Sequence, residues 1–217
     1  TASGRFDAPS RTYRLELTQT VPPTPGQPHK EPMVIPLALG LVDGEGRDLP
    51  LVTDRGERIE RGVLVLTEPA QTFVFKDIPS RPVLSLNRGF SAPVRLVDNL
   101  SAADLAFLAA RDPDPFNRWQ AVQSLATALL VDNVAALRAG RPTREDPALT
   151  TALRAILTDA ALEPAFVAQT LTLPSEADVA REIGQDVDPD AIFAARAELR
   201  RTTGQALADL LQETVTR

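Results

Sequence analysis

The period of the hydrophobic pattern changes near the middle of the chain, and this change constrains the fold more than any other feature. In the first part, apolar Tyr13, Leu15 and Leu17 alternate with polar residues, a period of two that is typical of a half-buried β-strand. In the second part, apolar residues recur at the three- and four-residue spacing of an amphipathic helix. The pattern therefore predicts a β domain over residues 1–98 and a helical domain over residues 99–217.

The first part consists of short apolar runs separated by turn signals. After the run around Tyr13, apolar runs occupy residues 33–42, 49–52, 62–67, 70–75 and 82–97, the last of which is expected to form a pair of strands. The turn at residues 43–46 contains two glycines, which supply the positive φ that hairpin turns need. Six to eight short strands at this spacing predict an antiparallel, Ig-like β-sandwich.

Helix-start signals divide the second part into five or six helices. The starts are capping boxes or acidic residues before proline, at Ser101–Asp104, Asp114–Pro115, Asp146–Pro147, Glu163–Pro164, Ser175–Asp178 and Asp188–Pro189. Gly140 and Gly184 are expected to end two of the helices. The helix from Pro189 is expected to be the last and longest. No fixed repeat length is evident, so we expect an irregular α-α array.

The expected core positions of these helices follow the apolar spacing. They are Trp119, Val122, Leu125, Leu129, Leu149, Leu153, Ile156, Leu157, Ile192, Leu199, Leu207 and Leu210.

Composition excludes several kinds of site and partner. The chain has no cysteine, which excludes disulfides, thiolate nucleophiles and cysteine metal ligands. Its net charge of -6, without a cluster of Lys and Arg, argues against nucleic-acid binding. The longest apolar stretch, Val34–Val42, is too short to span a bilayer, so no membrane partner is expected. The absence of cysteine fits a reducing compartment, and we expect a cytoplasmic protein.

The chain contains few of the side chains that most often act in catalysis. His29 is the only histidine, whereas a zinc site built on H-E-x-x-H needs two. It lies in a proline-rich stretch, which favours an exposed loop histidine over a catalytic one. No G-x-S-x-G, G-x-x-x-x-G-K-[ST] or G-x-G-x-x-G sequence is present.

Three carboxylate or aromatic groupings have alternative interpretations. Asp186, Asp188 and Asp190 have the odd spacing of calcium-loop ligands, but alanine occupies the position where glycine is needed, so helix capping is favoured. Asp112 and Asp114 could pair as acid and base, but each precedes a proline, as at a capped helix start. Phe116 and Trp119 are expected in a core, with a ligand-stacking platform as the alternative. We therefore predict no catalytic, cofactor-binding or metal-binding residue.

Six segments, in order along the chain, resemble bacterial aminopeptidase N, the zinc alanyl aminopeptidase family of the gluzincin type. They are LELTQTVPPTPGQ with IPLALGLVDGEG (15–46), EPAQTFVFKDI (68–78), SLNRGFSAPVRL (85–96), DPFNRWQAVQSLAT (114–127), LTLPSE (171–176) and VDPDAIFAAR (187–196). The resemblance covers the family's third, β-sandwich domain and the front of its C-terminal helical domain. It does not reach the catalytic domain, whose two His and one Glu bind zinc.

The resemblance implies a non-catalytic accessory segment, inactive alone, of an enzyme that releases N-terminal amino acids from peptides. The sandwich would be a spacer, and the helices would wall the substrate chamber. Its partners would be the catalytic and remaining helical domains of the same polypeptide and, through them, peptides. The start at Thr1 also suggests a piece of a longer chain.

Two alternatives remain open: a free-standing protein- or peptide-binding module, and a homologue that has lost zinc binding. In addition, a truncated helical array would expose Leu207, Leu210 and Leu211, and so could self-associate.

Overall fold

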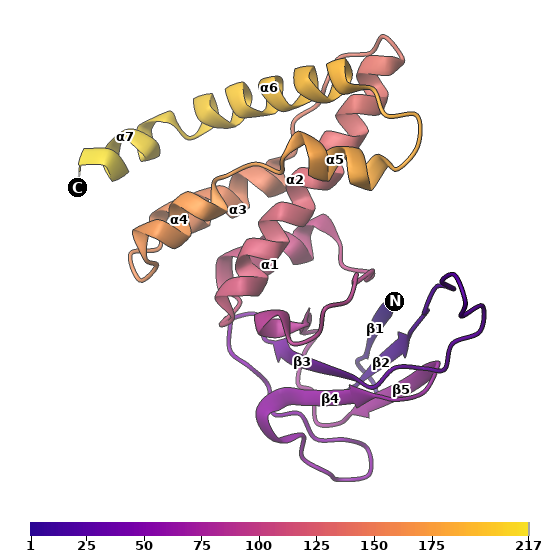
Figure 1. Ribbon diagram of the computed structural model, residues 1–217. Coiled ribbons are helices and arrows are strands. Elements are labelled where there is room, and N and C mark those ends of the chain that lie inside the picture. Colours follow the sequence, from indigo (N-terminus) through magenta and orange to yellow (C-terminus); the bar gives the residue numbers. More distant parts are fainter. Residues whose placement is uncertain (217) are drawn as a thin grey trace. The chain divides into compact units, whose positions relative to one another are not determined.

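The computed structural model describes residues 1–216, with side chains to residue 214, as two compact units (Figure 1). The first unit contains residues 1–101 together with residues 111–117. The second unit contains residues 102–110 and the chain from Arg118 onward.

The first unit is a sandwich of two three-stranded antiparallel sheets. Its strands are β1 (Ala2–Asp7), β2 (Thr12–Thr18), β3 (Ile35–Val42), β4 (Val63–Leu66), β5 (Ala70–Phe75) and β6 (Val83–Leu86). The strand order is β1-β2-β5 in one sheet and β4-β3-β6 in the other. The register pairs Leu15 of β2 with Phe73 of β5, and Leu39 of β3 with Leu86 of β6. The predicted Ig-like sandwich is therefore confirmed.

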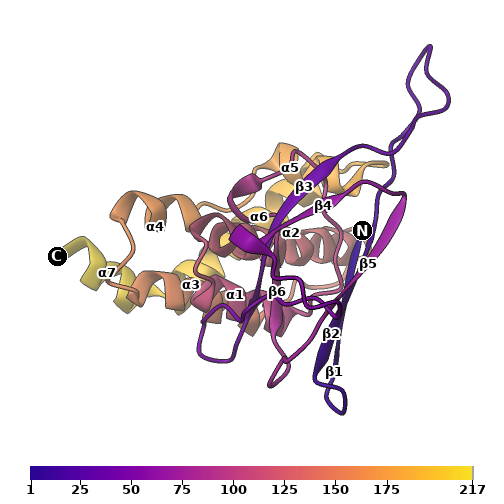
Figure 2. The same ribbon diagram turned by 90° about the horizontal axis from the view of Figure 1, so that it is seen from below.

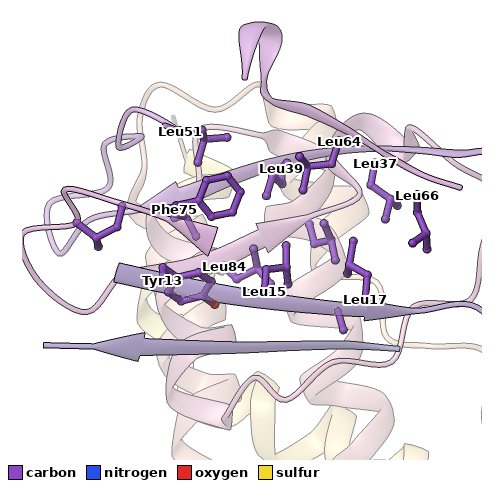
Figure 3. Close-up of a cluster of buried hydrophobic side chains, with 14 of the residues drawn as sticks. Tyr13, Leu15, Leu17, Leu37, Leu39, Leu51, Leu64, Leu66, Phe75 and Leu84 are labelled. Carbon is purple, nitrogen blue, oxygen red and sulfur yellow. The ribbon is translucent and has the colours of Figure 1, made fainter. Parts of the chain in front are cut away.

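The core of the first unit lies between the two sheets (Figure 3). Tyr13, Leu15 and Leu17 of β2 are buried, while the polar residues between them are exposed, as the alternation predicts. The opposite sheet contributes Leu37 and Leu39 of β3, also buried. Because successive side chains of a strand point to opposite faces, this alternation fixes the face of β2 that enters the core.

Three strand predictions differ from the structure. The apolar run over residues 49–52 does not form a strand, and Val52 makes only an isolated bridge, with Arg58. Strand β1 lies in a segment where no strand was predicted, because its residues alternate too weakly: only Ala2 is fully buried. The expected strand pair over residues 82–97 is wrong, since only β6 forms. The chain turns after it through a short 3₁₀ helix, η2 (Arg88–Phe90), which Asn87 enters with a φ of 61°. The later residues run as an extended segment whose Val97 carbonyl accepts a hydrogen bond from the Ala2 amide.

The second part of the chain forms helices separated by short loops (Figure 2). They are α1 (Ala102–Arg111), α2 (Pro115–Arg138), α3 (Pro147–Thr158), α4 (Pro164–Thr170), α5 (Glu176–Ile183), α6 (Pro189–Ala206) and α7 (Ala208–Thr216). The capping prediction is confirmed for Asp114 before α2, whereas Glu163 before α4 makes no side-chain cap. It is also confirmed at three later starts: Asp146 accepts from the Ala148 amide at 2.8 Å, and Asp188 from the Ala191 amide at 3.0 Å. The third, Ser175, forms a complete capping box with Asp178. Each acceptor satisfies an amide that has no partner within the helix.

The last helix was predicted wrongly in two respects. It ends at Ala206 and a further helix, α7, follows; α2, with 24 residues, is longer than α6, with 18. The break falls at Leu207, whose side chain is only 1% exposed. Its burial confirms Leu207 as one of the expected core positions and contradicts the separate expectation that it is exposed. Leu210 and Leu211 are half-buried, so they alone remain as the apolar surface expected to promote self-association.

The core of the second unit is built from the stripes that the helical spacing indicates. Its fully buried members on the longer helices are Val122, Leu125, Leu129, Leu130, Leu149, Leu153, Ile156, Ile192 and Leu199. Trp119 and Leu157 are half-buried.

Removing the α5 cap should destabilise the second unit measurably. In Ser175→Ala the Asp178 amide loses its 3.1 Å acceptor, so we expect the free energy of unfolding to fall by about 1 kcal/mol. Urea unfolding followed by Trp119 fluorescence measures the change. Thr151→Ala, on an exposed position of α3, is the matched control and should change little; an equal effect of both substitutions would contradict the capping role.

Candidate functional site

The structure places His29 in the exposed loop between β2 and β3. Within the part of the chain that the structure describes, no group of three His, Cys, Asp or Glu side chains could hold a metal ion. These residues therefore do not fit the zinc centre of the family that the sequence resembles, and no catalytic step through zinc can be built on them.

The aspartates with calcium-loop spacing do not form a ligand set. Asp188 caps α6, and the Asp186 carbonyl accepts a hydrogen bond from Nη1 of Arg138 at 3.0 Å. Asp190 lies exposed in the first turn of α6. The helix-capping interpretation of this run therefore agrees with the structure.

The two carboxylates before α2 have separate structural roles. Asp114 caps α2, because its Oδ1 accepts from the Asn117 amide at 2.9 Å. Asp112 is buried, and its Oδ1 accepts from the Asp114 amide at 2.9 Å. Both carboxylates are thus engaged by backbone amides at the start of α2, an arrangement that favours the capping interpretation over an acid–base pair.

Asp112 belongs to a polar network, here called the Arg88 cluster, formed by Asp48, Ser85, Arg88, Asp112 and Asn117, in which Asp48 is the exposed member. The Arg88 guanidinium donates to both carboxylate oxygens of Asp48 at 2.8 Å, to Oδ1 of Asp112 at 3.1 Å and to Oγ of Ser85 at 2.7 Å. Its side chain is 14% exposed, and that of Asp112 is 0% exposed. A planar guanidinium is suited to such a forked arrangement.

Two further residues, Gly40 and Asn117, position the Arg88 cluster. A Cβ on Gly40 would lie 2.3 Å from Cζ of Arg88, so only glycine at this position of β3 leaves room for the guanidinium. Nδ2 of Asn117 donates to Oγ of Ser85 at 2.8 Å and to the Leu86 carbonyl at 3.0 Å. The first turn of α2 is thereby tied to the end of β6 within the first unit.

Burial dominates the electrostatics of Asp112. Desolvation raises the pKa of its carboxyl, although hydrogen bonds from Ser85 and the Asp114 amide and the charge of Arg88 act in the opposite direction. The pKa of Arg88 is also raised: burial acts to lower it, but the hydrogen bond to Asp48 and the nearby carboxylate charges outweigh burial.

The raised pKa of Asp112 should give stability a pH dependence of defined sign. Above the ordinary value of 3.8, the folded state holds this proton more tightly than the unfolded state, so the stability contributed by Asp112 falls as pH rises through the folded pKa. The variant Asp112→Asn cannot ionise there. Urea unfolding of both proteins as a function of pH should show wild type losing stability relative to the variant on going upward from pH 3.8. A relative gain over that window would contradict the assignment.

A second buried arginine organises the helical unit. Nε of Arg118 donates to the Ala109 carbonyl at 2.8 Å, and Nη1 to Oδ2 of Asp159 at 2.9 Å. This hydrogen bond is the main reason that the pKa of the Asp159 carboxyl is lowered. Asp159 is also the residue that ends α3. Arg118 therefore connects the ends of α1 and α3.

The aromatic pairing also differs in part from the sequence prediction. The ring of Phe116 lies 5.7 Å from that of Phe90, tilted by 48°. Phe90 is 53% exposed and has a φ of 54°, which is uncommon for a side chain of this size. Neither the ring contact nor the positive φ of Phe90 was predicted. The contact joins residues 26 positions apart, so no local pattern indicates it.

The polar clusters of the described residues are suited to holding structure together rather than to catalysis. The Ser85 hydroxyl is buried and accepts two N–H groups, so it is not placed to attack a substrate. Each buried arginine is engaged by a carboxylate. The fold and these clusters thus define the class of the chain: an Ig-like β-sandwich followed by an array of helices, with no catalytic motif in its sequence.

Comparison with known protein families then identifies the chain more closely. Residues 1–99 match a family described as a domain of unknown function, DUF3458, with an Ig-like fold. Residues 102–217 match its companion, DUF3458_C, described as ARM repeats. The chain belongs to the DUF3458–DUF3458_C family and is homologous to the corresponding region of bacterial aminopeptidase N.

The individual relatives are longer proteins. Aminopeptidase N of Escherichia coli K12 is 38% identical over 211 residues, covering 97% of this chain and 24% of that protein. Aminopeptidase N of Haemophilus influenzae is 34% identical over 207 residues, covering 95% and 24%. The crystal structure of Legionella pneumophila aminopeptidase A in complex with aspartic acid superposes with a TM-score of 0.77 at 25% identity, covering 100% of this chain and 23% of that one. The chain therefore spans about a quarter of each relative.

Among the residues described, no helix is both long and apolar enough to cross a membrane.

Proposed function

We propose that this chain is a non-catalytic accessory segment of a zinc-dependent aminopeptidase that releases N-terminal amino acids from peptides. The observation that carries the proposal is the alignment of 97% of the chain with only 24% of an aminopeptidase N. The absence of a metal-binding group among the described residues is consistent with zinc being held elsewhere in such an enzyme.

In this proposal the two units have different roles. The sandwich, residues 1–98, is a spacer between the catalytic domain and the helices. The helical part, residues 99–217, walls the chamber through which peptides reach the zinc. The partners are the catalytic domain and further helices of the same polypeptide, and the enzyme is cytoplasmic. Isolated from them, the chain is inactive and can self-associate through Leu210 and Leu211.

A segment exchange tests this accessory role. The homologous segment of Escherichia coli aminopeptidase N is replaced by this chain, and a second variant lacks the segment. We expect the exchange variant to bind zinc and to cleave aminoacyl anilides. We expect the deletion variant, provided that it binds zinc, to lose discrimination between short and long peptides in kcat/KM. A zinc-loaded deletion variant with unchanged length preference would contradict the role of the helices as a chamber wall.

A further inference from the structure

A cavity in the first unit is bordered by three arginines. It has a volume of about 310 Å³, and the side chains of Arg58, Arg61 and Arg88 line it together with Asp48. Leu39 and Leu51, labelled in Figure 3, belong to its apolar floor. We call this cavity the arginine pocket. It lies entirely within residues of the first unit.

Positively charged side chains outnumber negatively charged ones in the lining of the arginine pocket. Arg88 is neutralised by Asp48 and Asp112. Arg58 and Arg61 are exposed, and across the described residues neither side chain makes a hydrogen bond or an ion pair. The lining thus contains three positive side chains and one negative one. With Asp112, the second partner of Arg88, included, the positive side chains still outnumber the negative ones, although the whole chain carries a net charge of -6. The local excess of positive charge favours an anion.

The backbone beneath the two free arginines is held in place. The Ile59 amide donates to the Leu51 carbonyl at 2.9 Å, and Val52 forms a β-bridge with Arg58. A Cβ on Gly62, which has a φ of 62°, would lie 2.7 Å from the Leu39 carbonyl oxygen. The segment that carries both arginines therefore packs directly against β3. A fixed backbone reduces the entropy lost when the side chains close on a ligand.

We propose that the arginine pocket binds a compact oxyanion, a carboxylate or phosphate group, between Arg58 and Arg61. A guanidinium presents parallel N–H groups that match two oxygens of either anion. Arg88, fixed by its carboxylates, forms one wall of the pocket and is not itself the free cation. This inference does not rest on the proposed aminopeptidase role, since it concerns residues of the sandwich alone.

NMR titration of the chain tests the site. Inorganic phosphate is added in one arm and succinate in the other, each against chloride at constant ionic strength, while backbone amides and arginine Nε–H signals are followed. We expect saturable shifts centred on residues 58–62. The double variant Arg58→Gln/Arg61→Gln should weaken binding at least tenfold. Saturation by either anion supports the site: phosphate alone indicates a phosphate group, succinate alone a carboxylate, and both together an oxyanion site without preference between them.

A matched control separates a specific site from general charge attraction. Arg55 is exposed on the same hairpin but does not line the pocket. Arg55→Gln should leave the dissociation constant within twofold of wild type, and the double variant should retain the unfolding midpoint of wild type. Equal weakening by Arg55→Gln, shifts that never saturate, or shifts centred elsewhere would overturn the proposal.

Discussion

Arg88→Met is expected to lower the free energy of unfolding of the first unit by about 3–5 kcal/mol at pH 7, the usual cost of removing one partner of a buried ion pair. Asp112 would remain with its side chain 0% exposed and without the cation that it contacts at 3.1 Å. Ser85 and Asp48 would lose their guanidinium hydrogen bonds as well. Methionine preserves an unbranched apolar stem, so the loss comes mainly from the charge.

Hydrogen exchange of the β2 and β3 amides measures this loss, because those strands form the centres of the two sheets. Arg47→Met is the control: Arg47 pairs with Asp43 and Glu45 on the surface, and no measurable change is expected. The loss in Arg88→Met should also be smaller near pH 4, where Asp112 can take up a proton. Equal effects of the two substitutions, or a loss independent of pH, would show that Arg88 is held only by packing.

Phe75→Ala is expected to cost about 3–5 kcal/mol, the range for truncating a buried aromatic side chain. The Phe75 side chain is 0% exposed, its strand position pairs with Tyr13 of β2, and it forms a bridge with Thr53 (Figure 3). Truncation leaves a cavity that is bordered by β2 and by the segment containing Thr53. Such a cavity closes only in part when the surrounding residues relax.

Urea unfolding monitored by near-ultraviolet circular dichroism of Tyr13 reports on the same core. Val65→Ala on β4 is the matched control, because Val65 is 46% exposed and its truncation removes little buried surface. Phe75→Leu should recover most of the loss by filling the cavity. If Phe75→Ala proved no more destabilising than Val65→Ala, the two sheets would not enclose the core described here.

Local signals were sufficient for most elements of this fold. The alternation of β2 and the acidic residue–proline pairs before α2, α3 and α6 depend only on neighbouring residues, and the structure confirms them. Elements whose formation depends on distant partners were missed. Strand β1 is recognisable through its pairing with β2 rather than through its own pattern. The end of α6 depends on the burial of Leu207.

The polar clusters could not be predicted for the same reason. Asp48, Ser85 and Asp112 are brought to Arg88 only by the folded sheets and the first turn of α2. One signal was available: Ser85 is the single polar residue within the apolar run of β6, whose residues are all buried. A buried hydroxyl needs hydrogen-bond partners, so this position could have indicated a polar network.

We proposed above that the chain is a non-catalytic accessory segment of a zinc-dependent aminopeptidase. Zinc content and hydrolysis of an aminoacyl anilide, measured on this chain beside a full-length aminopeptidase N, test it most directly. We expect a folded chain without stoichiometric zinc and without hydrolysis, next to a zinc-loaded, active full-length enzyme. Hydrolysis by this chain alone, abolished by a chelator and restored by zinc, would contradict it.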